Sequence, residues 1–161
     1  MVAQQKYLKI LTPADWLIIL GTLSVLVGGL LSAACAHDPS RIMMWASAYL
    51  VLAAGAVQVA LGLLLKKLTP LNDVRNLYTA LVLYNVGGVG VIIGTALKTS
   101  VVGPTILVLS EVFLALALAA IFYSARGAKR SKWLVAMYIL LGVMFISMLI
   151  GLILSALIHL S

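Results

Sequence analysis

The sequence predicts an all-α, polytopic integral membrane protein, a five-helix transmembrane bundle in one membrane domain, residues 1–161. Two observations predict this class. Of the 161 residues, 64% are hydrophobic and 9% are charged, whereas soluble domains are about 45–50% apolar and about 25% charged. Five stretches also reach the roughly 20 apolar residues that a helix needs to cross a bilayer. This composition excludes a water-soluble enzyme, a disordered tail and a nucleic-acid-binding module.

The five apolar stretches must be helices, because lipid offers backbone groups no hydrogen-bond partner and a helix satisfies its own. The polar pieces between them are too short to hold a soluble domain. The expected spans are residues 14–36, 42–65, 74–97, 101–124 and 133–158.

The first span carries a clear start signal. Thr12 can cap the helix, Pro13 suits the first helical position, and Asp15 can close a capping box. Residues 34–36 form an A-x-A-like site that would suit a cleaved signal peptide. However, the apolar stretch before it exceeds the usual h-region of about 7–15 residues. We therefore expect a retained transmembrane helix.

Tryptophan marks the beginning of the first, second and fifth spans, at Trp16, Trp45 and Trp133. These positions are typical of the aromatic belt at the two membrane surfaces. The third span contains the glycine-rich stretch 87–90, which superficially resembles a phosphate-binding loop. It lies at membrane depth with no strand before it, so we interpret it as a packing surface.

The basic residues predict the orientation of the chain. Five spans place the two termini on opposite sides, and nine of the eleven Lys and Arg residues fall on the side of the N-terminus. The positive-inside rule then predicts a cytoplasmic N-terminus and an outside C-terminus in the cell (plasma) membrane. This explains the net charge of +7 without a polyanionic partner. The nine are Lys6, Lys9, Lys66, Lys67, Arg75, Arg126, Lys129, Arg130 and Lys132, and the other two are Arg41 and Lys98.

Small residues four positions apart predict helix-packing surfaces, because apolar burial does not bring helices together in lipid and close backbone approach must do so. Three spans carry such a stripe, and surface is left over for another chain. The stripes are Ser24, Gly28 and Ser32 in the first span, Gly90 and Gly94 in the third, and Ser147, Gly151 and Ser155 in the fifth.

A tandem hairpin repeat is a further hypothesis. Similar Leu-Thr-Pro motifs open residues 11–15 and 68–73, and Val-Gly-Gly follows in both halves at 27–29 and 86–88. The implied unit of about 58 residues is an in–out–in helical hairpin used twice, at 11–67 and 68–126.

Glu111 is the acidic residue that lies deep inside a predicted span, where a charge costs at least about 2.5 kcal/mol. No basic residue lies at comparable depth, so we expect a neutral Glu111 that donates to Asn85, with Tyr84 and Ser110 nearby. Two interpretations stay open. Glu111 either titrates during transport of a proton or cation, or forms an interhelical hydrogen bond. Gln58, in the second span, is expected to bond between helices.

The rest of the sequence contains few residues that could bind a metal or act in catalysis. Cys35, His37, Asp38 and His159 share the outer side and include zinc and copper ligands, but their spacing follows no metal motif. No metal and no cofactor is therefore predicted, and the outer histidines are badly placed for a haem. The sequence contains no CxxC, H-E-x-x-H or nucleophile–base pattern, so we do not expect an enzyme.

The function expected from these residues is a non-enzymatic membrane subunit, packed within a larger membrane complex or a homo-oligomer. The alternative is a small proton- or cation-coupled transporter or channel in which Glu111 and Asn85 line the path. The expected partners are the lipid bilayer and other membrane subunits or copies of the chain, with no nucleic acid. Bound lipid is the one small-molecule ligand considered, at headgroups near the basic linker 126–132.

Overall fold

The computed structural model describes residues 11–38, 40–68 and 74–160, with the side chains of 74, 152 and 154–160 left out. These residues form helices and contain no strand. In chain order the elements are α1 (Pro13–Ala34), α2 (Arg41–Val51), the π-helix η1 (Leu52–Val57), α3 (Gln58–Lys67), α4 (Val74–Ala96), α5 (Val102–Ala125) and α6 (Lys132–Leu160).

Five helical rods in the described chain are long and apolar enough to cross a membrane, as the sequence predicted. The second rod is continuous from Arg41 to Lys67 and consists of α2, η1 and α3. The rods begin and end within two residues of the expected spans. The protein is thus all-helical, with the composition of a multi-pass membrane protein.

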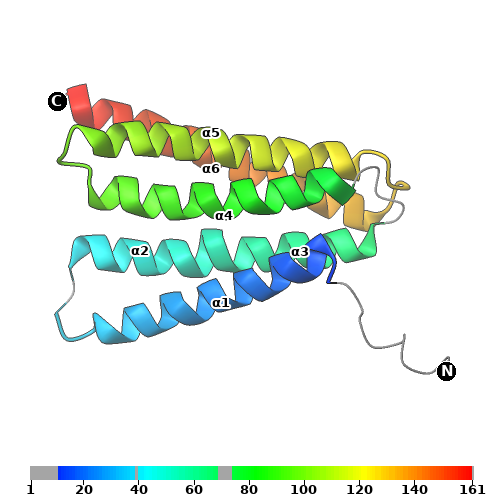
Figure 1. Ribbon diagram of the computed structural model, residues 1–161, viewed down its shortest axis with the longest axis horizontal. Coiled ribbons are helices and arrows are strands. Elements are labelled where there is room, and N and C mark those ends of the chain that lie inside the picture. Colours follow the sequence, from blue (N-terminus) through cyan, green and yellow to red (C-terminus); the bar gives the residue numbers. More distant parts are fainter. Residues whose placement is uncertain (1–10, 39, 69–73, 161) are drawn as a thin grey trace, which may run out of the picture.

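The rods pack as two antiparallel hairpins and one further helix (Figure 1). Helix α1 lies against the α2–η1–α3 rod, and α4 makes its extensive contact with α5. Helix α6 crosses behind and contacts α5 and α3. The start of α1 and the end of α6 lie at opposite ends of the bundle (Figure 1).

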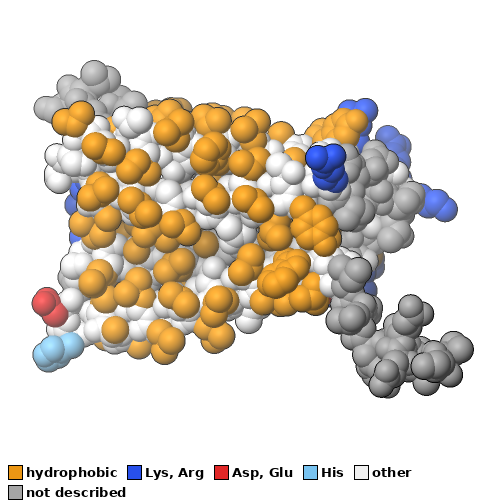
Figure 2. Space-filling view, viewed as in Figure 1, with side chains coloured by type: hydrophobic (Ala, Val, Ile, Leu, Met, Phe, Trp, Pro, Cys, Tyr) orange, Lys and Arg blue, Asp and Glu red, His pale blue; other side chains and the backbone are white. Residues whose placement is uncertain are grey.

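Side chains are distributed as a lipid-facing surface requires. Hydrophobic side chains cover the shaft of the bundle, and Lys and Arg gather at the end where α1 begins (Figure 2). Leu30 is 71% exposed and Ile139 is 63% exposed, whereas Leu61, Ile121 and Met137 are fully buried. Large exposed apolar residues would disfavour a soluble fold and suit a bilayer.

The start of α1 forms the predicted capping box. Thr12 Oγ1 accepts from the Asp15 backbone N–H at 3.3 Å, and Asp15 Oδ2 accepts from the Thr12 backbone N–H at 2.9 Å. Pro13 is the first helical residue. The structure adds an ion pair that the sequence did not indicate, between Asp15 Oδ1 and Lys66 Nζ at 2.5 Å. It ties the start of α1 to the end of α3.

Glycines bring α1 and the second rod together. A Cβ on Gly21 would lie 2.9 Å from the carbonyl oxygen of Gly55, and one on Gly62 would lie 2.7 Å from that of Ala14. A Cβ on Gly28 would lie 2.9 Å from the carbonyl oxygen of Ser47. Within each rod these glycines are seven residues apart, which is nearly two helical turns and thus one face. Gly28 was predicted at a packing face, whereas Gly21, Gly55 and Gly62 were not, because only spacings of four were considered.

The α4–α5 contact also depends on glycine. A Cβ on Gly87 would lie 2.9 Å from the Ser110 carbonyl oxygen, and one on Gly94 would lie 2.9 Å from the Leu107 backbone nitrogen. Gly90 faces the Ser110 side chain directly. Gly90 and Gly94 therefore lie at a helix contact, as does Gly28 in α1.

The small-residue stripe of α6 makes no such contact within the described chain, so its role in helix packing stays a prediction. Ser147 and Gly151 are exposed, and nothing lies within 4 Å of a Cβ added to Gly151. The Ser155 side chain is outside the described residues. In α1, Ser32 is likewise exposed. The reason is that α6 packs through its first half, where Met137 and Leu141 are buried.

The two halves of the hypothetical repeat correspond to the two hairpins, α1 with α2–η1–α3 and α4 with α5. The π-helix occurs in the first hairpin, and α4 and α5 are α-helical throughout. Most of the second Leu-Thr-Pro motif, residues 69–73, lies outside the described residues.

Two adjacent glycines test the α1 interface. Gly28→Val should destabilise the fold by about 1–3 kcal/mol, because the new side chain would overlap the second rod. Gly29→Val is the matched control, since nothing lies within 4 Å of a Cβ at Gly29. Thermal unfolding in detergent measures both. Equal melting temperatures for the two variants would contradict the interface.

Candidate functional site

The second rod changes its helical pitch at mid-depth. Residues Leu52–Val57 form the π-helix η1, although the sequence suggested a uniform α-helix. π-helical turns are rare in proteins, and those that occur are frequently found at functional sites. In this turn, the Ala53 carbonyl oxygen accepts a hydrogen bond from the Tyr84 hydroxyl at 2.6 Å. The π-helix is therefore linked directly to α4.

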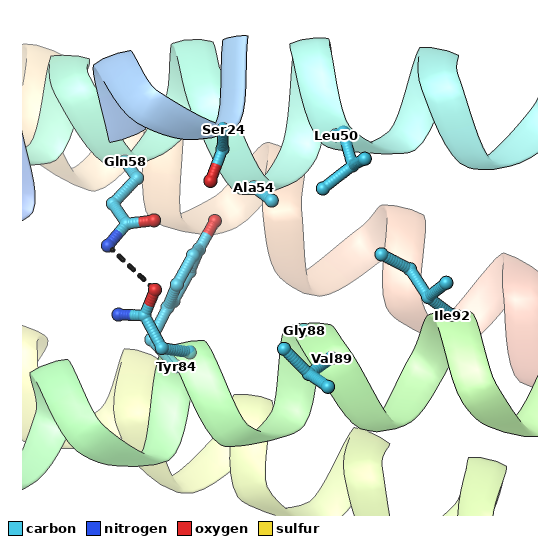
Figure 3. Close-up of a pocket in the computed structure, with 9 residues that line it drawn as sticks. Ser24, Leu50, Ala54, Gln58, Tyr84, Gly88, Val89 and Ile92 are labelled. Carbon is cyan, nitrogen blue, oxygen red and sulfur yellow. Dashed lines mark hydrogen bonds between the residues drawn. The ribbon is translucent and has the colours of Figure 1, made fainter. Parts of the chain in front are cut away.

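Gln58 follows the π-helix and is completely buried. Its Nε2 donates to Asn85 Oδ1 at 3.3 Å (Figure 3). Asn85 Nδ2 donates to the Leu81 carbonyl at 2.8 Å. The structure thus places Gln58 in the interhelical role expected for it, and Asn85 is its partner. Gln58 Oε1 is buried and has no partner in the described chain.

A pocket of about 50 Å³ lies beside this amide pair. Ser24, Gln58 and Tyr84 point into it from α1, the second rod and α4 (Figure 3). Asn85 is the fourth polar residue of the lining, which contains no charged side chain. The full lining is Ser24, Leu50, Ala54, Gln58, Tyr84, Asn85, Gly88, Val89 and Ile92.

The expected hydrogen bond between Glu111 and Asn85 is absent, which corrects the sequence interpretation. Asn85 is bonded to Gln58 and Leu81, and Glu111 Oε2 is buried without a partner in the described chain. Ser110 Oγ donates to the Ile106 carbonyl at 2.6 Å and faces α4. Because successive residues are 100° apart around a helix, Glu111 is turned away from the α4 contact.

Tyr49 lies near the pocket, next to Gly88. It is close enough to interact electrostatically with Glu111 and with Tyr84. Its hydroxyl oxygen lies 3.7 Å from the position of a Cβ on Gly88, which also lines the pocket. We call Glu111, Tyr49 and Tyr84 the polar line. The sequence analysis missed Tyr49, although it lies about as far from the beginning of α2 as Glu111 lies from the beginning of α5.

The weak metal candidates do not converge. The Cys35 Sγ is 3.3 Å from the Met43 Sδ, and His37 and Asp38 are exposed. Among the described residues, no group of three or more His, Cys, Asp or Glu side chains could hold a metal ion. The His159 side chain lies outside the described residues.

Comparisons with protein families, curated proteins and solved structures gave no match for this chain. Two features inside the bundle bear on function together with the uncovered surface of α6. One is the uncharged pocket at Gln58, and the other is the unpartnered carboxylate of Glu111 with the polar line.

The hydroxyl of Tyr84 provides a test of the π-helix contact. Tyr84→Phe should lower stability by about 1 kcal/mol, because the Ala53 carbonyl loses its donor. Tyr123→Phe is the control, since Tyr123 is exposed at the bundle surface. Thermal unfolding and amide hydrogen exchange over residues 52–58 report the change. Unchanged exchange in Tyr84→Phe would argue against the contact.

Proposed function

We propose that this chain is a non-enzymatic integral membrane subunit that assembles with other transmembrane helices, in a larger complex or as a homo-oligomer. The observation that carries the proposal is the outer surface of α6. Ser147 and Gly151 form a small-residue stripe there, and the described chain leaves it uncovered. Such stripes are the surfaces through which helices associate in lipid.

Glu111 gives the proposal independent support. A half-buried carboxylate at membrane depth is unfavourable without a partner, and the described chain supplies none. A donor from another subunit would complete its hydrogen bonding. Glu111 Oε2 is buried inside this chain. A donor from another subunit would therefore bond to the other carboxylate oxygen, Oε1.

The proposed orientation places the N-terminus in the cytoplasm and the C-terminus outside, in the plasma membrane. Its support is the concentration of Lys and Arg at the end of the bundle where α1 begins. At this end, the linker between α5 and α6 contains Arg126, Lys129 and Arg130. We propose lipid headgroups as its ligands and expect no other bound cofactor.

Two glycines on opposite faces of α6 test assembly. Gly151→Leu should shift the protein towards single chains, because a large side chain would block helix contact at the stripe. Gly142→Leu is the matched control: it too has nothing within 4 Å, and nine residues at 100° each place it about half a turn around the helix. Native mass spectrometry in mild detergent measures the assembly. A monomeric parent protein, or equal effects of both variants, would contradict the proposal.

A second candidate function is a small proton- or cation-coupled transporter. The specific observation that favours it is the polar line, since Glu111 interacts with Tyr49, and Tyr49 with Tyr84 beside the pocket. In this function Glu111 would take up and release a proton or bind the cation. The carboxylate would then face its ligand inside this chain instead of a neighbouring subunit.

Substitution of Glu111 separates the two functions. If the chain is a transporter, Glu111→Gln should reduce ion flux into proteoliposomes to background, because the amide cannot titrate. Asp38→Asn is the control, as it removes an exposed loop carboxylate. If the chain is an assembly subunit, Glu111→Gln should retain assembly through its hydrogen-bonding amide, and Glu111→Leu should lose it. Flux that survives Glu111→Gln would exclude a titrating role.

A further inference from the structure

The amide orientations at the pocket are fixed by their own hydrogen bonds. Asn85 Nδ2 donates to the Leu81 carbonyl, so Asn85 presents Oδ1 towards the second rod. An oxygen accepts but cannot donate, and Gln58 must therefore present Nε2 to it. This leaves Gln58 Oε1 as an acceptor without a donor, on a side chain with no exposed surface.

The pocket that Gln58 lines is small and contains no charged side chain. Its cavity volume of about 50 Å³ exceeds the roughly 10–15 Å³ that a cavity needs in order to hold one water molecule. The lining contains no charged side chain, so nothing there would offset the desolvation of an ion. The Ser24 and Tyr84 hydroxyls supply further hydrogen-bonding groups within the same space (Figure 3).

We propose that this pocket is a binding site for water, held at Gln58 Oε1 between α1, the π-helix and α4. Water donates to the unpartnered oxygen and can bond to the hydroxyls of Ser24 or Tyr84. Gln58 lies nine residues before Lys67, the last residue of α3, or about 14 Å along the helix axis. The site thus lies near the middle of the second rod, in a pocket whose lining includes the exposed Val89. It is independent of the proposed assembly, because none of its lining residues belongs to α6.

Water contact can be measured directly. The test is proton-detected solid-state NMR of the full chain in hydrated bilayers, with magnetisation transferred from water to the protein. We expect transfer to the Gln58 side-chain amide to be several-fold faster than transfer to Ala117, which is equally buried but lies on α5 outside the pocket. Equal, slow transfer to both residues would overturn the proposal.

A matched pair of variants locates the water. Ser24→Val should fill the pocket and reduce transfer to Gln58 several-fold, whereas Ser32→Val, the same change at an exposed position of α1, should leave it unchanged. Unreduced transfer in folded Ser24→Val would overturn the assignment to this pocket. Mass spectrometry of a solvent extract provides a second measurement. A small organic molecule present at one equivalent, released from the parent protein but not from Ser24→Val, would also overturn it.

Discussion

Helix α1 can lie against the α2–η1–α3 rod because glycine occupies the contact on both sides. Gly21 meets the backbone at Gly55, and Gly62 meets the backbone at Ala14, at distances that leave no room for a Cβ. Lipid tails are as apolar as leucine, so the hydrophobic effect gives these helices no reason to associate, and close packing must hold them. This approach brings Ser24 to the pocket that Gln58 also lines, and so creates the internal site.

Polar groups inside the bundle bond mainly to one another. The π-helix is tied to α4 because the Ala53 carbonyl accepts from Tyr84, and the two amide side chains bond to each other. Two buried oxygens are left without a partner in the described chain, Gln58 Oε1 and Glu111 Oε2. They differ in chemistry: the first borders an uncharged pocket, and the second belongs to a titratable group. The proposed hydration site accounts for the first, and the second belongs to the residue at which we propose a subunit contact or ion binding.

The residues that sequence analysis interpreted correctly act locally. Thr12 and Asp15 are three positions apart, and their capping bonds need only that spacing. The partner of Asn85 could not be predicted in the same way. Gln58 and Glu111 both lie on other helices, and the choice between them depends on the rotation of each helix. The packing of Ser110 against Gly90 sets that rotation for α5 and turns Glu111 away.

Composition along the chain predicts the five helices, their ends and their apolar surface, because the energy of placing each segment in lipid depends on its own residues. The tertiary structure alone decided which stripe is covered and where the π-helix lies. It also placed the Tyr49 hydroxyl beside Gly88, at the pocket. These features depend on contacts between helices far apart in sequence, and a few ångströms of backbone separation at glycine control them.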